Sequence, residues 1–391
     1  MRAATTSHRP AMVAARGSHR PAMVAARGFA GGVPVATADR GRWLVSARWD
    51  VAVFGGSALL AFALLVWGRV SGTLEGVTPA WAWVATVLAV DVAHVWSTAY
   101  RVYLDPDERL RRPALYLGLP VAAYVAGVVL YSTSAGLFWR VLAYLAVFHF
   151  VRQQYGWVAL YRRRLGPVAP LDRFLDDAAI YSATLYPILW WHAHLPREFE
   201  WFIEGDFIPG LPLAAAARLL PVHLLITAAY IARQLWLRVH RRPVSPGKDL
   251  VIATTWLTWY VGIVVLDSDY AFTVTNVIVH GVPYLALVWR YGQGRFRGSA
   301  GLRGRVFQAR GWPLFLASLI AAAWLEEWGW DRFVWHERPA LFPGPDLAMS
   351  AAALGLLVPL LALPQATHYL LDAWIWRVKG NPGLRRKLGF E

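Results

Sequence analysis

The chain has 391 residues, of which 57% are hydrophobic and 16% charged, with a mean hydropathy of +0.38 and a net charge of +15. Soluble domains are usually about half apolar and a quarter charged, so this composition argues against a soluble protein and favours a polytopic membrane protein. The absence of cysteine excludes disulfides, iron–sulfur clusters and thiolate metal sites. Any metal must therefore be held by imidazole and oxygen ligands.

The first segment of the chain is polar and repetitive. The string SHRPAMVAARG runs from Ser7 to Gly17 and again from Ser18 to Gly28, and no acid precedes Asp39. An arginine-rich, acid-poor leader resembles a transit peptide, but the segment lacks the apolar core of a secretory signal. We expect residues 1–45 to form a disordered cytosolic tail that arose by a recent duplication.

Ten apolar stretches follow, and each is close to the roughly 20 residues that a helix needs to cross a bilayer. They are 50–69, 79–100, 113–132, 137–160, 177–195, 212–237, 249–267, 270–290, 312–330 and 349–376. The predicted fold class is therefore all-α. We expect a polytopic transmembrane helix bundle of about ten spans over residues 46–378 and a basic cytosolic tail over 379–391.

The connections between these stretches alternate in charge. Arginines cluster on one side, at 109–112, 162–164, 238–242, 295–310 and 385–387, whereas acids gather on the other, at 75, 198–206, 267–269 and 326–331. The positive-inside rule then places both termini in the cytoplasm. We expect an integral protein of the bacterial inner membrane. Because the basic residues are dispersed over short loops, we expect no nucleic-acid partner.

Ionisable residues inside the stretches are concentrated in the even-numbered ones. They are Asp91, His94, His149, Arg152, His223, His280, His368 and Asp372. Such residues usually face the interior of a bundle or a wet cavity. The pattern therefore predicts that the even-numbered helices line the inside and that the odd-numbered helices face lipid.

Four histidines on four different stretches fall at similar depth. His94, His149, His280 and His368 precede the arginines that end their stretches by seven, thirteen, ten and nine residues. At about 1.5 Å per residue, all four lie roughly 10–20 Å from the cytosolic edge. This common level predicts one metal centre whose ligands are the four imidazoles.

Each histidine has polar residues three or four positions away, on the same helical face. Asp91 accompanies His94, Asn276 accompanies His280, and both Gln365 and Asp372 accompany His368; Arg152 and Gln153 accompany His149. A metal-bound imidazole commonly donates its second N–H to such a group. We expect Arg152, Gln153, Asp91 and Asp372 to be catalytic and Asn276 and Gln365 to contribute to cofactor binding. Asp91 or Asp372 can alternatively be a ligand itself, as in a di-metal centre.

Two other interpretations of these histidines stay open. They can form a proton or substrate pathway, or they can be interhelical hydrogen-bonding residues. His223 lies at the same depth but has only Thr227 as a polar neighbour at helical spacing. We expect His223 to be a packing residue, with a fifth ligand as the alternative. No span carries histidines at two depths, which argues against a two-haem cytochrome.

Single histidines on separate membrane helices resemble the arrangement proposed for the Brp/Blh carotene-cleaving dioxygenases. That resemblance rests on His94, His149, His280 and His368 and implies an iron centre and a carotenoid substrate. The strings HFVRQQYGW and ATHYLLDAWIWR, by contrast, look like motifs of an uncharacterised bacterial membrane family. The clustered histidine boxes of membrane desaturases and the H-E-x-x-H motif are absent.

The sequence therefore favours a metal-dependent membrane oxidoreductase. Iron is the expected cofactor, with zinc, manganese and copper as alternatives. The expected partners are membrane lipids, a hydrophobic substrate that enters from the inner leaflet and an unidentified electron donor. A proton- or ion-coupled transporter built on the same buried cluster is the second hypothesis, and a non-catalytic lipid-binding protein is the third.

Overall fold

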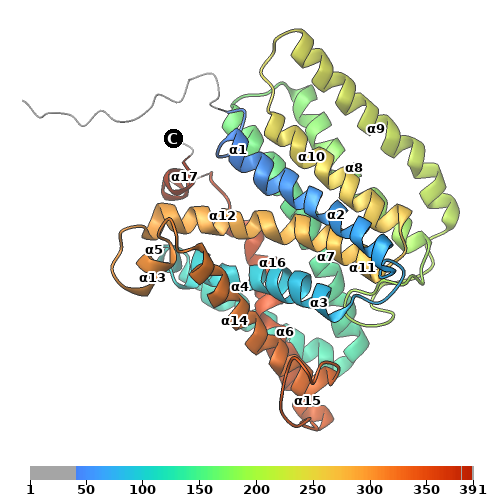
Figure 1. Cartoon of the computed structure of the whole chain (residues 1–391), viewed down its shortest axis with the longest axis vertical. Helices are drawn as coiled ribbons and strands as arrows, with labels where there is room; N and C mark the ends of the chain where they lie inside the picture. Colours follow the sequence, from blue (N-terminus) through green and yellow to red (C-terminus); the bar gives the residue numbers. More distant parts are fainter. Residues whose placement is uncertain (1–40, 380, 390–391) are drawn as a thin grey trace, which may run out of the picture. The chain divides into compact units, whose positions relative to one another are not determined.

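The computed structural model describes residues 41–379 and 381–389, in which the regular elements are helices. The predicted N-terminal repeat lies outside the described residues. In the first half of the chain the helices form five long rods, two of them built from several consecutive elements (Figure 1). These rods are α1–η2–α2 (Ala47–Asp50, Val51–Gly55, Gly56–Ser71), α3–η3–α4–η4 (Ala80–Trp83, Val84–Val92, Ala93–Thr98, Ala99–Tyr103), α6 (Pro113–Thr133), α7 (Ala135–Leu165) and α8 (Pro170–Ala193).

The second half of the described chain adds five further rods. They are α9 (Leu213–Val239), α10–η5 (Pro246–Trp259, Tyr260–Val265), α11–η6–α12 (Asp269–Phe272, Thr273–Val277, Ile278–Phe296), α14–η7 (Trp312–Trp330, Asp331–Trp335) and α15–α16 (Ala351–Leu361, Leu363–Ile375). Three short helices lie between or after the rods: α5 (Pro106–Arg111), α13 (Gly301–Val306) and α17 (Pro382–Leu388). The all-helical prediction is confirmed for the part of the chain that the structure describes.

Within the described residues, eight of the rods are long and apolar enough to cross a membrane. The two exceptions are α8, which carries Asp172, Arg173, Asp176 and Asp177 in its first half, and α14, which ends near Glu326 and Glu327. Eight such helices indicate an integral membrane protein. The count of ten spans, the cytoplasmic termini and the bacterial inner membrane stay predictions.

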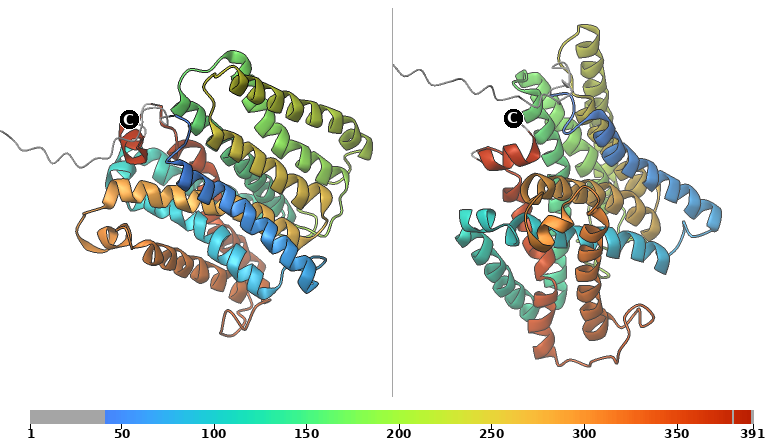
Figure 2. Two further views of the ribbon diagram at one scale, coloured as in Figure 1. Left: turned by 45° about the horizontal axis from the view of Figure 1, so that its top comes forward. Right: turned by 60° about the vertical axis from the view of Figure 1, so that its left-hand side comes forward.

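The four rods that carry His94, His149, His280 and His368 are 44–89% buried over their most apolar stretches. The rod α11–η6–α12 is the most enclosed of the candidate membrane spans among the described residues, since 89% of its most apolar stretch is buried. Its helix α12 runs through the middle of the bundle (Figure 1). The prediction that even-numbered stretches line the inside is wrong for the sixth, α9, of which only 17% is buried. Helix α9 packs mainly on α8, at the outer side of the bundle (Figure 2), whereas α10, an odd-numbered stretch, packs against both α7 and α8.

π-helical turns precede two of the four histidines. Segment η3 ends directly before α4, which carries His94, and η6 ends directly before α12, which carries His280. Such turns rotate the following residues relative to a regular helix and are frequent at functional sites. The two rods also approach closely at Gly281, where a Cβ atom would lie 2.5 Å from Val90 Cγ1.

The basic segment after residue 378 contains helix α17, which packs against α12. Its Lys387 Nζ lies 3.2 Å from Asp105 Oδ2, and Asp105 also accepts hydrogen bonds from Tyr291 and Arg295. Burial opposes ionisation of Asp105, but the hydrogen bond from Tyr291 and the charges of Lys387 and Arg295 hold its pKa below the usual value. The network ties the end of the described chain to the bundle.

Candidate metal centre

Four imidazoles from four different rods meet inside the bundle. His94 lies on α4, His149 on α7, His280 on α12 and His368 on α16, and each is 0–1% exposed. The Nε2 atoms of His94 and His280 are 3.1 Å apart, and those of His149 and His368 are also 3.1 Å apart. Histidines separated by as many as 274 positions in the sequence therefore present the same ring atom toward one region of space.

The spacing of these nitrogens suits a metal ion. His94, His149 and His368 each offer a nitrogen within 4.8 Å of the others, which makes them a candidate ligand set. The His280 ring lies beside this trio, with centroid distances of 4.7 Å to His94 and 5.0 Å to His149. Imidazole nitrogens bind zinc at about 2.0–2.1 Å, which places adjacent ligand nitrogens about 2.8–3.4 Å apart in octahedral or tetrahedral geometry. The two 3.1 Å pairs already have that separation.

Oxygen atoms lie behind three of the four rings. His94 Nδ1 is 3.5 Å from Asp91 Oδ1, His149 Nδ1 is 3.7 Å from Asp372 Oδ2, and His368 Nδ1 is 2.7 Å from Thr98 Oγ1. Only the contact of Thr98 with His368 is a hydrogen bond, because His94 Nδ1 and Asp91 Oδ1 have no hydrogen-bond partner among the described residues and the Asp372 oxygen lies 3.7 Å from His149. A group that accepts from Nδ1–H fixes the tautomer and orientation of a ligand imidazole. Asp91 lies beside His94, and its catalytic role stays a prediction. Asp372 was expected beside His368, its neighbour on α16, but it faces His149 on α7, because its side chain points across the helix interface.

Two further predicted site residues, Gln153 and Arg152, contact groups other than the imidazoles. Gln153 Nε2 donates to the His280 carbonyl oxygen at 2.8 Å, which connects α7 to α12. Arg152 donates to the Tyr181 hydroxyl and lies 4.6 Å over the Tyr155 ring. Neither side chain is hydrogen-bonded to one of the four imidazoles in the described structure.

The two amides predicted to support the cofactor do not contact the imidazoles next to them in sequence. Asn276 Nδ2 donates to the Phe272 carbonyl oxygen and to Thr275 Oγ1, since Asn276 lies in the π-helical segment η6. Gln365 Nε2 donates to Glu326. The Nδ1 atom of His280 has no hydrogen-bond partner among the described residues.

Sequence reasoning missed two groups close to the centre. Thr98 lies four residues after His94 on one helical face, and this spacing was an available signal for its place beside His368. Glu326 accepts hydrogen bonds from Trp96 Nε1 at 2.6 Å and from Gln365. The sequence placed Glu326 in an outer acidic connection, but the structure buries it at the end of α14.

His223 provides a comparison for the four histidines. It lies on α9, is hydrogen-bonded to Ser182 Oγ at 2.8 Å and is stacked on Tyr186 and Trp256. No contact joins it to the four imidazoles in the described residues. This arrangement agrees with the expected packing role, so His223 is a natural control for substitutions at the centre.

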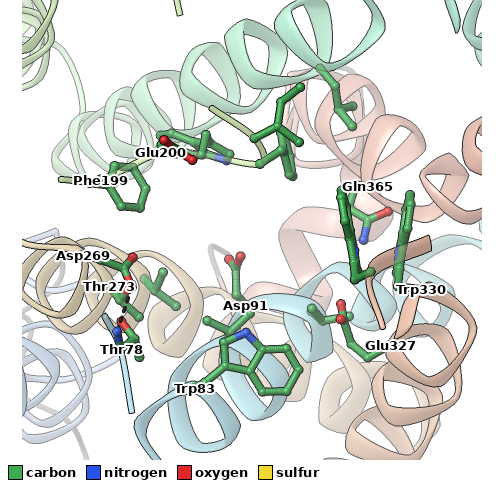
Figure 3. Close-up of a pocket in the computed structure, with 18 of the residues that line it drawn as sticks. Thr78, Trp83, Asp91, Phe199, Glu200, Asp269, Thr273, Glu327, Trp330 and Gln365 are labelled. Atoms are coloured by element: carbon green, nitrogen blue, oxygen red, sulfur yellow. Dashed lines mark hydrogen bonds between the residues drawn. The ribbon is translucent and has the colours of Figure 1, made fainter. Parts of the chain in front are cut away.

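Three cavities reach the surroundings of the centre. The first has a volume of about 530 Å³, and Asp91 points into it beside Glu327, Gln365 and Glu200 (Figure 3). The second, of about 510 Å³, reaches His149 and Asp372 and is lined mainly by basic, aromatic and aliphatic residues. The third, of about 380 Å³, is mostly apolar and reaches Thr98 and His368 between α4, α6 and α16. The basic and apolar cavities thus each border one of the four histidines, whereas the acidic cavity borders Asp91.

Comparisons with protein-family models, with curated proteins and with solved structures found no match. The chemistry of the site therefore has to be inferred from its own residues. A buried set of neutral nitrogen donors, backed by carboxylates and a hydroxyl, is suited to binding a first-row transition metal.

Proposed function

We propose that the protein is a metal-dependent oxidoreductase of the membrane, with iron as the metal, that oxygenates a hydrophobic substrate. The observation that carries this proposal is the convergence of the Nε2 atoms of His94, His149, His280 and His368, with two pairs 3.1 Å apart. Iron held by imidazoles supplies the capacity to activate dioxygen. Four protein ligands would leave two positions of a six-coordinate ion for small molecules.

The residues around the imidazoles have definable tasks in this proposal. Thr98 orients the His368 ring through the hydrogen bond at Nδ1, and the carboxylates of Asp91 and Asp372 lie 3.5 and 3.7 Å from Nδ1 of His94 and His149. Gln153 fixes the backbone of His280. Burial of all four rings excludes bulk water, which limits side reactions of a reactive centre.

The apolar cavity supports a hydrophobic substrate or co-substrate. Leu117 on α6 and Leu360 on α15 line it and are 59% and 51% exposed, so the cavity lies next to the lipid-facing surface. His368 lies at its inner end. An apolar molecule dissolved in the bilayer, dioxygen included, can approach the centre by this route.

A transporter is the second candidate, and the cavities give it a specific basis. The acidic cavity reaches Asp91 and the basic cavity reaches Asp372, so polar openings approach the histidines from two directions. The same His and Asp side chains could then carry protons during transport. Such a protein needs no bound metal.

Two measurements on one preparation separate these functions. An oxygenase consumes dioxygen when the detergent-purified protein receives a membrane lipid extract, and His149→Ala abolishes the uptake while His223→Ala retains it. A proton-coupled carrier instead shows pH-driven flux in proteoliposomes without oxygen uptake. The oxidoreductase would be refuted if pH-driven flux persists after complete removal of metal and the iron-loaded protein takes up no dioxygen.

A further inference from the structure

The basic cavity beside His149 has an unusual distribution of charge. Five cationic side chains line it, and the single carboxylate in its lining is Asp372, which faces His149. The five cations are Arg112, Arg152, Arg163, Arg377 and Lys379. Among the described residues, none of the five forms an ion pair with a carboxylate.

Several arginines at other helix ends are neutralised by carboxylates. Arg162 pairs with Asp177 at 2.6 Å, Arg233 with Asp172 at 2.7 Å and Arg295 with Asp105 at 3.0 Å. The positive-inside rule explains why basic residues gather at this end of the spans. It does not explain why five unpaired cations surround a cavity that continues to a buried histidine.

One of these cations is held in place near the centre. Arg152 follows His149 by three residues on α7, so both side chains emerge on one face of that helix. The guanidinium donates to Tyr181 and stacks over Tyr155, which orients it before any ligand arrives. A guanidinium binds the two oxygens of a carboxylate or phosphate in a planar, bidentate manner.

The remaining wall of the cavity is apolar. Phe148, Leu160, Leu287 and Val378 line it together with the rings of Trp157 and Trp376. Its volume of about 510 Å³ is in the range of pockets that enclose small organic ligands, roughly 300–1,000 Å³. The cavity therefore combines a cationic rim with a hydrophobic wall and has an imidazole at its inner end.

We propose that this cavity binds an amphiphile that has one anionic headgroup, a carboxylate or a phosphate, and an apolar chain. The headgroup lies among Arg152, Arg163 and Arg377, and the chain extends along the apolar wall toward His149. This inference rests on the proposed function, because the chain end near His149 is then the part that reacts. The separate apolar cavity at His368 is left for dioxygen.

The experiment measures binding of oleate, oleyl phosphate, oleyl alcohol and butyrate to the full chain in a neutral detergent, by native mass spectrometry with titration. We expect one oleate or oleyl phosphate per chain, bound at least about tenfold more tightly than the alcohol, because hydrogen bonds between a guanidinium and an anionic oxygen are stronger than those to a neutral hydroxyl. Butyrate should compete poorly because it lacks the chain. Equal binding of oleate and oleyl alcohol would overturn the headgroup assignment, and competition by butyrate at equal concentration would overturn the chain assignment.

Two pairs of variants locate the ligand. Arg152→Gln with Arg163→Gln should weaken oleate binding about 10- to 100-fold, while Arg241→Gln with Arg242→Gln, exposed on the α9–α10 connection, should not. Gly156 lines the cavity and a Cβ added there meets no atom within 4 Å, so Gly156→Phe should place its ring in the cavity and block binding. The matched control is Gly118→Phe on α6, which has equally open surroundings. If a control variant loses as much oleate affinity as the variant it is matched to, the ligand does not lie in this cavity.

Metal content of the same samples separates this inference from the proposed function. Metal without selectivity for the anion refutes the headgroup site and leaves the oxidoreductase intact. Selectivity for the anion in a chain that never binds metal refutes the oxidoreductase and leaves the headgroup site intact.

Discussion

Thr98 gives the sharpest test of how the centre is held together. Its hydroxyl lies 2.7 Å from His368 Nδ1, and the side chain is 4% exposed. When His368 binds a metal through Nε2, its Nδ1–H donates to Thr98 Oγ1. Thr98→Val keeps the shape of the side chain but leaves this N–H without a partner in a buried site. An unsatisfied buried donor costs about 1–3 kcal/mol.

That cost should appear as weaker metal binding. Because about 1.4 kcal/mol corresponds to a tenfold change in affinity, we expect Thr98→Val to weaken metal binding by about 5- to 150-fold. Groups behind metal-bound histidines typically contribute 10- to 100-fold. The assay is competition for the metal by a chelator of known affinity, and Thr98→Ser, which retains the hydroxyl, should restore most of the affinity.

A matched substitution controls for general damage to the helix. Thr86 lies on the same rod, is 2% exposed and donates to the Ala82 carbonyl oxygen at 2.6 Å, without contacting a histidine. Thr86→Val should therefore leave metal affinity within about twofold of the parent. If Thr98→Val binds metal as tightly as the parent, or if Thr86→Val loses as much affinity, the role assigned to Thr98 is wrong.

Two further predictions concern packing and pH. Gly281→Ala forces a Cβ against Val90, so it should destabilise the fold by about 1–3 kcal/mol and weaken metal binding, whereas Gly118→Ala should do neither in the same thermal-unfolding assay. Asp105→Asn should lower stability at neutral pH by removing the ion pairs with Lys387 and Arg295. The folded state holds the pKa of Asp105 below its ordinary value. The stabilisation by this carboxylate is therefore present above the pKa of the unfolded state and is lost as the pH falls through the pKa of the folded state. The free energies of unfolding of the parent and of Asp105→Asn should thus converge as the pH is lowered. A difference between them that stays constant with pH would contradict the role of the ionised Asp105.

The sequence predicted the helical class and the histidines well, because both depend on strong local signals. Long apolar stretches specify helices in lipid, and isolated ionisable residues in them indicate an interior position. All ten expected stretches coincide with helical rods in the described chain. Counting to the next arginine was enough to place His94, His149, His280 and His368 at one level.

The partners of those histidines were harder to predict, because they depend on contacts between helices. Asp372 shares a helix with His368 but faces His149, and Thr98 shares a helix with His94 but binds His368. Same-helix spacing cannot reveal such crossed pairs. The π-helical segment η6 adds a second difficulty, since it directs the amide of Asn276 toward its own helix.

The shallow burial of α9 has a similar cause. His223 suggested an interior helix, but that ring is satisfied by Ser182 and by stacking on Trp256 and Tyr186 from neighbouring helices. A single polar residue can therefore be accommodated on a helix that otherwise faces outward. Only its three-dimensional surroundings distinguish it from the four central histidines.

The most direct test of the central claim is the metal content of the purified protein, measured by elemental analysis on the parent chain and on single histidine variants. We predict close to one iron per chain in the parent and in His223→Ala, and a loss of most of that iron in His94→Ala, His149→Ala and His368→Ala. A parent chain that stays free of transition metal after loading with iron, or variants that retain it fully, would contradict the account.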